Sequence, residues 1–416
     1  MKNNNRYDLS NFLIHFFREI DPEDTDTPVL PENWGFHSLE ILEAPFTPFF
    51  MLRNAVRHGQ VWATWAIRGG KRTIYGHDPA VCFTEMPIAA FLEAGVERAR
   101  RGEAMSAFGL VFAKSGLHQI GARPVIYGLD GSPRMANTNG PARIIDRTQL
   151  APAEQYRYVT FEPGAKRPID WSHEREWRWP LRTGRGLDAF DLPPAYDDIC
   201  GLELDTPSMG PLGAIVRTRD QADRLLYDIL MKIDRGDITP DHYSFVLPTD
   251  EVSQPADLRD PASLNRAIDQ AAVTVSKYAE ISSKRAKRLA GRFSSLVKHI
   301  EGDTEPFEFG QTGGCWLWVM DNRTSLIRAL IKTGRAFVNK DGKYLIHLDG
   351  FDQDRSLRQR QNMTLRLADG VKKEFRVSGT YFSVADNTCP DELPFFCGVH
   401  DDDPLVYNHS DLPPDV

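Results

Sequence analysis

The sequence has no long apolar run and few cysteines. Its hydrophobic stretches are all shorter than the roughly 20 residues that a membrane-spanning helix needs, so the 416 residues predict no membrane partner. Residues 1–6 lead into an amphipathic segment and not into the apolar region of a signal peptide. The five cysteines are odd in number and irregularly spaced, which excludes a disulfide framework and favours a reducing, cytoplasmic location.

Several catalytic fingerprints are also missing. There is no lysine-containing phosphate loop, no H-E-x-x-H helix, no G-x-S-x-G turn and no dinucleotide fingerprint opening a helix. Cys389, Cys397 and His400 do not have the spacing of a closed zinc site, which starts from a tight cysteine pair. We therefore predict no metal site. The net charge of -8 excludes a protein that is basic throughout, but it leaves room for local basic patches.

The composition is that of an ordinary globular protein, with 41% hydrophobic and 26% charged residues. At about 150 residues per domain, this length predicts two or three domains. Glycine and proline punctuate residues 182–212 and indicate a boundary there. We therefore predict an N-terminal domain over 1–200 and an accessory α/β part over 201–416. The alternative is that the accessory part consists of two modules divided near residue 301.

Hydrophobic periodicity predicts the main elements. Apolar residues at helical spacing predict a helix over 8–20, and further helices over 49–58 and 88–100. His58-Gly59 is predicted to end the second of these helices as a C-cap. Residues 80–84 read as a buried strand. A strand–helix–strand run between residues 213 and 247 predicts a small α/β unit, and residues 261–300 are predicted to be helical throughout.

The most unusual stretch runs from Trp171 to Pro180 and holds Glu174 and Glu176 two residues apart. In an extended segment, such residues point to the same face. Two like charges on one face repel unless a cation, a ligand or a shared proton intervenes. The pair would suit chemistry on a cationic centre. The alternative is a solvated strand whose carboxylates pair with arginines, for which the neighbours Arg175, Arg178 and Arg182 are available.

Polar side chains also flank the predicted strand 80–84. Tyr75 precedes it, and Thr84 and Glu85 end it. Sites are often built at strand ends, where loops leave a rigid scaffold. The alternative is a loop entering a core strand, with Thr84 and Glu85 capping the next helix. Cys82, inside the apolar strand, reads as a buried thiol and not as a nucleophile.

Three further residues are candidates for binding an anion. Arg53 and Arg57 are four apart and share a helix face, and two arginines can bind a diphosphate through paired hydrogen bonds. A solvated helix face is the alternative. His37 is the other isolated polar residue of this half, and a structural histidine is the alternative there.

A basic run lies in the second half of the chain, over residues 284–298. Its members are Lys284, Arg285, Lys287, Arg288, Arg292 and Lys298. Such a run can contact the phosphates of DNA or RNA. The alternative is a solvated helix face in an acidic protein.

Three segments carry a family resemblance. Val81–Pro87 (VCFTEMP), Gly121–Tyr127 (GARPVIY) and Glu174–Arg178 (EREWR), in that order, resemble the AbiGi-like and DUF2971-like proteins of bacteria, which are associated with phage defence. The resemblance covers about residues 30–182. The second half resembles an uncharacterised domain that accompanies this type. The AbiGi-like domain is in turn similar to ADP-ribosyltransferases, including DarT-type toxins that modify nucleic acid.

The resemblance implies an α+β fold with a split, mostly antiparallel sheet over 1–200, followed by α/β modules. It implies a phage-defence effector that transfers ADP-ribose from NAD to a macromolecular acceptor, with nucleic acid as one such acceptor. Glu176 would face the ribose and Glu174 would activate the acceptor. His37 or the pair Arg53/Arg57, together with Tyr75 and Thr84, would bind NAD.

Two other functions stay open. One is a non-catalytic module that binds nucleic acid, a phage protein or a cognate antitoxin. The basic run 284–298 is the observation that favours it. The other is a metal-dependent nuclease that uses Asp170, Glu174 and Glu176. The nuclease predicts a need for metal and none for NAD.

Overall fold

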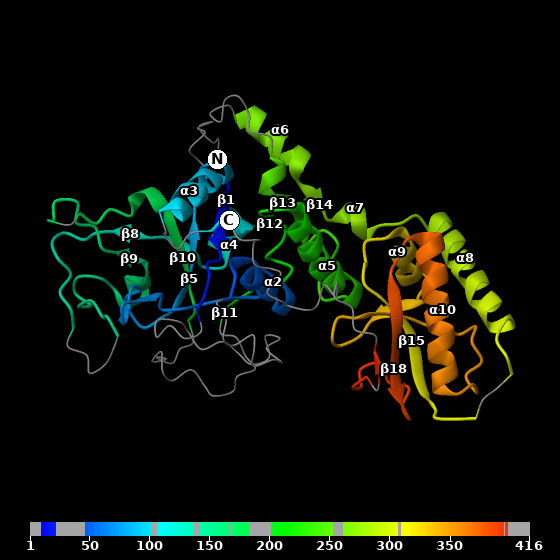
Figure 1. Cartoon of the computed structure of the whole chain (residues 1–416). Coiled ribbons are helices and arrows are strands. Elements are labelled where there is room, and N and C mark those ends of the chain that lie inside the picture. Colours follow the sequence, from blue (N-terminus) through cyan, green and yellow to red (C-terminus); the bar gives the residue numbers. More distant parts are fainter. Residues whose placement is uncertain are drawn as a thin grey trace. The chain divides into compact units, whose positions relative to one another are not determined.

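The computed structural model describes residues 10–21, 46–101, 106–136, 142–166, 168–182, 201–252, 261–306, 309–394 and 396–397. Helices and strands both contribute to the fold, which confirms the predicted α+β class (Figure 1). The contacts divide the chain into two compact units. Unit 1 takes the described residues up to Asp223 and those of Asp241–Val273, and unit 2 takes Arg224–Pro240 and the described residues from Thr274 onward.

Unit 1 is built on an eight-stranded sheet with the order β14-β13-β12-β6-β1-β5-β10-β7. The pairings from β7 through to β12 are antiparallel, and β12 and β13 are parallel. The strands of the sheet are β1 (Phe12–Phe16), β5 (Ala80–Thr84), β6 (Gly109–Ala113), β7 (Arg123–Pro124), β10 (Glu176–Pro180), β12 (Leu212–Val216), β13 (Tyr243–Pro248) and β14 (Val273–Thr274).

Helices and short strand pairs surround this sheet. The helices are α2 (Pro48–His58), α3 (Ile88–Arg100), α4 (Lys114–Gln119) and α6 (Pro261–Ala271), and α5 (Arg219–Arg235) crosses from unit 1 into unit 2. The paired strands are β2 (Gln60–Trp62) with β11 (Gly201–Glu203), β3 (Ile67–Arg68) with β4 (Lys71–Arg72), and β8 (Ile126–Tyr127) with β9 (Tyr158–Val159). Short 3-10 turns are η1 (Pro152–Arg157), η2 (Ser172–Glu174) and η3 (Thr249–Glu251).

Helix α3 covers one face of the sheet. Phe91 is fully buried and packs in one cluster with Ile14, Val111 and Ile215, which come from β1, β6 and β12. Burial of such side chains contributes about 1.5–3 kcal/mol each. The helix was predicted over 88–100 from its apolar spacing and is observed over the same residues. Ile14 pairs directly with Thr84, so Thr84 lies on this same face.

Unit 2 contains a five-stranded sheet, ordered β16-β17-β15-β18-β19, with antiparallel pairings. The strands are β15 (Gly313–Val319), β16 (Ala336–Val338), β17 (Tyr344–Ile346), β18 (Gly379–Ala385) and β19 (Phe396–Cys397), and the helices that follow α5 are α7 (Ser276–Ala279), α8 (Ser283–Gly302), α9 (Ser325–Lys332) and α10 (Leu357–Phe375). Phe293 of α8, Ile327 of α9 and Leu367 of α10 are fully buried in one apolar cluster. The three helices therefore share one core with the sheet.

A polar network lies beside that core. Arg328 of α9 forms a buried ion pair with Asp234 at 2.6 Å, and the Tyr344 hydroxyl donates to the same carboxylate at 2.6 Å. A buried charge is tolerated only when it is paired and hydrogen-bonded. This network therefore ties the end of α5 to α9 and β17 within unit 2.

The predicted helix over 8–20 is wrong, because residues Phe12–Phe16 form strand β1. This strand lies between β5 and β6, and its neighbouring residues Leu13 and Ile14 are both fully buried. A strand that is buried on both faces shows no alternation, so its apolar run cannot be told from a helix by period alone.

The division of the chain also differs from the predicted one. The sheet of unit 1 continues beyond residue 200, because β12 pairs with β6. Nor does the chain divide near 301, because α8 and the elements that follow it belong to unit 2. The predicted continuous helix over 261–300 is wrong as well: it is interrupted by β14, and α8 begins after Ser282, whose hydroxyl accepts from the backbone N–H of Arg285 at 3.4 Å.

Gly59 ends α2 in the left-handed conformation, with φ +65°, as the predicted C-cap requires. A Cβ at this position would stand 2.1 Å from a carboxylate oxygen of Asp205. We expect Gly59→Ala to lower the free energy of unfolding by more than the about 1–2 kcal/mol that the left-handed conformation alone costs an L-residue. Urea denaturation measures this.

Gly70→Ala is the matched control, because Gly70 has φ +70° and no atom within 4 Å of the added Cβ. Equal losses of stability in the two variants would show that the Asp205 contact is unimportant.

Candidate functional site

The two predicted glutamates lie where β10 begins. Glu176 is the first residue of β10 and pairs across the strands with Thr84, the last residue of β5. Cross-strand partners point to the same face of a sheet. The Thr84 hydroxyl donates to the backbone carbonyl of Glu174 at 2.7 Å and accepts from the backbone N–H of Met86 at 3.2 Å. Thr84 therefore holds the turn that precedes β10 against the end of β5.

A strained residue separates the two glutamates. Glu174 ends the 3-10 turn η2, and Arg175 has φ +48° and ψ +48°. Left-handed conformation is uncommon for a residue other than glycine, and it costs about 1–3 kcal/mol unless its surroundings enforce it. The prediction that Glu174 and Glu176 share one face of an extended segment is therefore wrong, because Glu174 belongs to a 3-10 turn and the left-handed Arg175 separates it from β10.

Each glutamate has its own cation. Glu174 forms an ion pair with Arg98 of α3, and the ring of His173 lies 3.6 Å from the same carboxylate. Glu176 accepts from Arg178 at 2.7 Å and 3.2 Å. The predicted repulsion between the carboxylates is thus relieved by separate pairing. The pairing of Glu176 with Arg178 agrees with the structural alternative, whereas Arg98 was not foreseen as a partner.

Arg178 is the buried centre of this arrangement. Its guanidinium also donates to the carbonyl oxygens of Tyr156 at 2.7 Å and Tyr158 at 3.3 Å. Burial would lower the pKa of Arg178, but the charge and hydrogen bonds of Glu176, together with Cys82, outweigh burial and leave that pKa above its ordinary value. Arg178 therefore stays charged and fixes the orientation of Glu176, which keeps 19% of its side chain exposed.

Two other groups border Glu176. The Tyr127 hydroxyl accepts from the backbone N–H of Glu176 at 3.0 Å, and burial raises the pKa of Tyr127. Cys82 pairs across the strands with Arg178. Burial, and after it the charge of Glu176, raises the pKa of Cys82 to about 12. The thiol therefore stays protonated at neutral pH, in line with its prediction as a buried thiol.

Glu85 binds side chains on the face of the sheet opposite to Glu176 and Thr84. Its carboxylate accepts from Lys114 at 2.9 Å, from Arg175 at 3.2 Å and from the Trp177 indole at 2.8 Å. Its backbone N–H donates to the carbonyl of Arg175 at 3.2 Å. Glu85 therefore holds the strained residue from two directions. The sequence placed it beside Thr84 and offered two roles for it, part of a site at the strand end or a helix cap, but not the holding of Arg175.

Of the residues predicted to bind NAD, Thr84 pairs directly with Glu176, and the other described ones contact other parts of unit 1. Tyr75 is buried, and the Arg143 guanidinium lies 4.0 Å above its ring. Arg53 is fully buried in α2, 5.8 Å from the ring of Phe49. Among the described residues, no contact joins Arg53 or Arg57 to Glu174 or Glu176. His37 lies outside the described residues.

An early histidine that the sequence did not single out is present in the sheet. His15 lies in β1 next to Ile14, and Ile14 shares the face of Thr84, so His15 points to the other face. Its Nδ1 donates to the carbonyl of Cys82 at 2.9 Å, and its ring lies 6.0 Å from that of Phe83. Burial lowers the pKa of His15 to about 4.

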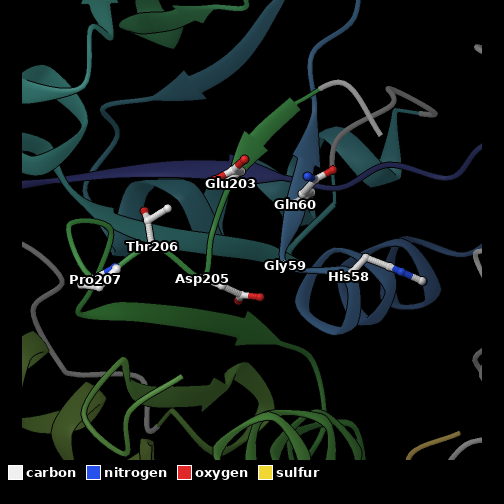
Figure 2. A pocket seen from close by; sticks show the side chains of 7 residues that line it. All are labelled: His58, Gly59, Gln60, Glu203, Asp205, Thr206 and Pro207. Atoms are coloured by element: carbon white, nitrogen blue, oxygen red, sulfur yellow. The ribbon is translucent and has the colours of Figure 1, made fainter. Parts of the chain in front are cut away.

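A surface pocket of ≈ 430 Å³ lies elsewhere in unit 1 (Figure 2). Its walls come from the end of α2, the start of β2, the end of β11 and the loop that follows β11, and it is lined by His58, Gly59, Gln60, Glu203, Asp205, Thr206 and Pro207. None of the residues predicted to act on NAD lines it. Two carboxylates face this pocket, which makes it unsuited to a diphosphate.

Two further predictions concern metal and membrane. Within the described ranges, no group of three or more His, Cys, Asp or Glu side chains is placed to hold a metal ion. The Asp170 carboxylate instead accepts from the backbone N–H of Ser172 at 2.9 Å and from its hydroxyl at 2.6 Å. No helix among the described residues is both long and apolar enough to cross a membrane.

Comparison with known proteins gives one match. The family described as a protein of unknown function (DUF4427) matches residues 281–409. This range begins just before α8 and includes the sheet of unit 2. No curated protein and no solved structure matches the chain significantly.

Replacing Arg178 tests the buried ion pair. Arg178→Met leaves the Glu176 carboxylate without its cation and two carbonyl oxygens without a donor. We expect the free energy of unfolding to fall by about 3–5 kcal/mol, measured by urea denaturation. Arg217→Met removes an exposed pair with Asp250 at 4.0 Å and should cost less than about 1 kcal/mol. Similar losses in the two variants would contradict a structural role for Arg178.

The buried histidine predicts a pH dependence. The folded-state pKa of about 4 lies below the ordinary 6.5, so between these values the unfolded state binds more protons at His15. Stability should therefore rise with pH from about 4 to 6.5, by up to about 3 kcal/mol. His15→Gln should flatten this part of the profile. An unchanged profile would show that His15 is not responsible.

Proposed function

We propose that the chain transfers ADP-ribose from NAD to a macromolecular acceptor and that it acts in phage defence. The observation that carries the proposal is the pairing of Glu176 with Thr84 on adjacent strands, with a buried arginine fixing the carboxylate. The order of the segments Val81–Pro87, Gly121–Tyr127 and Glu174–Arg178, shared with AbiGi-like proteins, supports the role in defence.

The sheet of unit 1 supports an ADP-ribosyltransferase-like fold. Strands β1, β5 and β10 are neighbours, and their pairings are antiparallel. Strand β1 comes early in the chain, β5 ends on the hydroxyl residue Thr84, and β10 begins with Glu176. The three strands lie next to one another in the sheet. That is the order of features on which the resemblance rests.

The chemistry uses the two glutamates differently. Cleavage of the nicotinamide–ribose bond develops positive charge on the ribose, and a fixed carboxylate stabilises that charge. Glu176 suits this role because Arg178 holds it in one orientation while part of it stays exposed. A bond forms between the acceptor and the ribose, nicotinamide leaves, and the acceptor's proton passes to a base. Glu174, on the turn before β10, is the proposed base.

The contacts of NAD and the acceptor are proposals as well. Arg53, Arg57, Tyr75, Thr84 and His37 stay predicted contacts of NAD. Of those that the structure describes, Thr84 pairs directly with Glu176 and donates to the carbonyl of Glu174. The basic run in α8 favours nucleic acid as the acceptor over a phage protein or an antitoxin, because its charge suits a polyanion.

Labelled NAD incubated with the protein and phage-infected lysate tests the transfer. We expect labelled macromolecules from the wild type and a rate about 10²–10³-fold lower from Glu176→Gln, since a neutral amide stabilises positive charge far less. Asp170→Asn is the control. It keeps an oxygen for Ser172, and transfer should be unaffected by this change and by a metal chelator.

Two outcomes would count against the transferase. Nucleic-acid cleavage that needs metal and is lost in Asp170→Asn would favour the nuclease. The absence of any NAD turnover, with Glu176→Gln equal to wild type in infected cells, would favour the non-catalytic binding module.

A further inference from the structure

Helix α8 presents an interrupted row of cations to solvent. Lys284, Lys287, Arg288 and Lys298 are exposed, and within the described residues none of them forms an ion pair or a hydrogen bond through its side chain. Lys287 and Arg288 follow Lys284 by three and four residues, and Lys298 follows Arg288 by ten residues, nearly three turns, so all four lie on one side of the helix. The apolar side of α8, which includes Phe293, is buried in the core of unit 2. The row is therefore a fixed feature of a folded helix.

The acidic groups of α8 do not neutralise this row. The helix carries six lysines and arginines against one glutamate, Glu301, a formal charge of +5. Glu301 is engaged by Arg355 at 2.8 Å, and Asp303, just after the helix, by His299 at 3.3 Å. Of the cations, Arg292 is paired with Glu374 of α10 at 2.7 Å. Arg285 donates to the Ser325 hydroxyl at 2.8 Å, and the other four have no acidic partner among the described residues, in a protein whose net charge is -8.

Two small residues fill the gap in the row. Gly291 and Ser295 are exposed between Arg288 and Lys298. Nothing lies within 4 Å of the place where a Cβ on Gly291 would stand. Glycine is unfavourable inside a helix, and no packing contact here requires it. A small residue at this place lets a ligand approach the helix backbone closely.

We propose that the row Lys284–Lys287–Arg288–Lys298 binds the phosphate backbone of a nucleic-acid duplex, with Gly291 and Ser295 as the point of closest approach. The row extends over about 21 Å at 1.5 Å per residue, which is more than half a helical turn of a duplex. Its side chains are those that contact phosphates, so binding would not depend on base sequence. Duplex binding depends on the proposed function only where the bound duplex is taken to be the acceptor of ADP-ribose.

The chemistry of the surface favours a duplex over other polyanions. Single strands are bound by aromatic side chains on which bases stack, and α8 exposes no aromatic residue. A helix lying in a membrane surface places its apolar face in lipid. The apolar face of α8 is already used by Phe293 and Leu289 in the core.

Fluorescence anisotropy with labelled duplexes of two unrelated sequences, each about two helical turns long, tests the proposal. The full-length variant with Lys284, Lys287, Arg288 and Lys298 all changed to Gln should bind about 100-fold more weakly at low salt. The slope of log affinity against log salt should also become shallower by about 3 to 4 units. Both sequences should behave alike.

A control variant with the same change in net charge excludes a general charge effect. Arg68, Lys71, Arg147 and Lys166 are exposed residues of unit 1, and changing these four to Gln should leave binding within about twofold of wild type. Equal losses in both quadruple variants would overturn the assignment to α8.

Gly291→Leu tests, without altering the net charge, whether the duplex approaches the backbone of α8 closely at this position. Leucine favours the helix, so the variant should be at least as stable as wild type. We expect it to bind duplex about tenfold more weakly, because its side chain stands between the helix and the phosphates. Unchanged affinity would contradict close approach at Gly291.

Two further ligands and one further variant complete the test. Tighter binding to a single strand, or to vesicles of an anionic phospholipid, than to duplex would overturn the proposal. Glu176→Gln should bind duplex like wild type. Absence of NAD turnover in the wild type, with intact duplex binding, would therefore count against the transferase alone. Absence of duplex binding in the wild type, with intact NAD turnover, would count against the surface alone.

Discussion

The candidate site depends on the burial of a single guanidinium. Arg178 enters the sheet on β10, where water cannot solvate its charge, and a buried cation persists only with a full set of partners. Glu176 supplies the anion, and the carbonyls of Tyr156 and Tyr158 accept the remaining donors shown. The need to pair Arg178 therefore holds the start of β10 against the segment from η1 to β9. It also sets the orientation of the Glu176 carboxylate.

The same constraint explains why the two glutamates diverge. If both lay on one strand face, they would share a single cation and repel each other. The left-handed Arg175 instead sends Glu174 to Arg98 on α3, and Glu85 holds Arg175 through its side chain and its backbone. Strain at one residue therefore gives two carboxylates separate environments, which is how paired acids acquire different roles.

Sequence reasoning recovered the elements whose pattern is local. The end of α2 at Gly59 and the full extent of α3 follow from apolar spacing and a C-cap signal. It failed at β1, because burial on both faces removes the alternation that marks a strand. In the site, it found Glu176 and Thr84 but missed Arg98 and the full role of Glu85. Those contacts join residues about 75 to 90 positions apart, and no local pattern encodes them.

The distribution of charge separates two kinds of basic residue. Near β10, the carboxylates of Glu85, Glu174 and Glu176 all have cationic partners, so this region is balanced internally. Helix α8 is different, because its acidic residue is engaged elsewhere and four of its cations are exposed without an acidic partner among the described residues. Repulsion along such a row lowers the stability of an isolated helix. Its persistence on a helix held by a buried core is explained most simply by a polyanion that neutralises it.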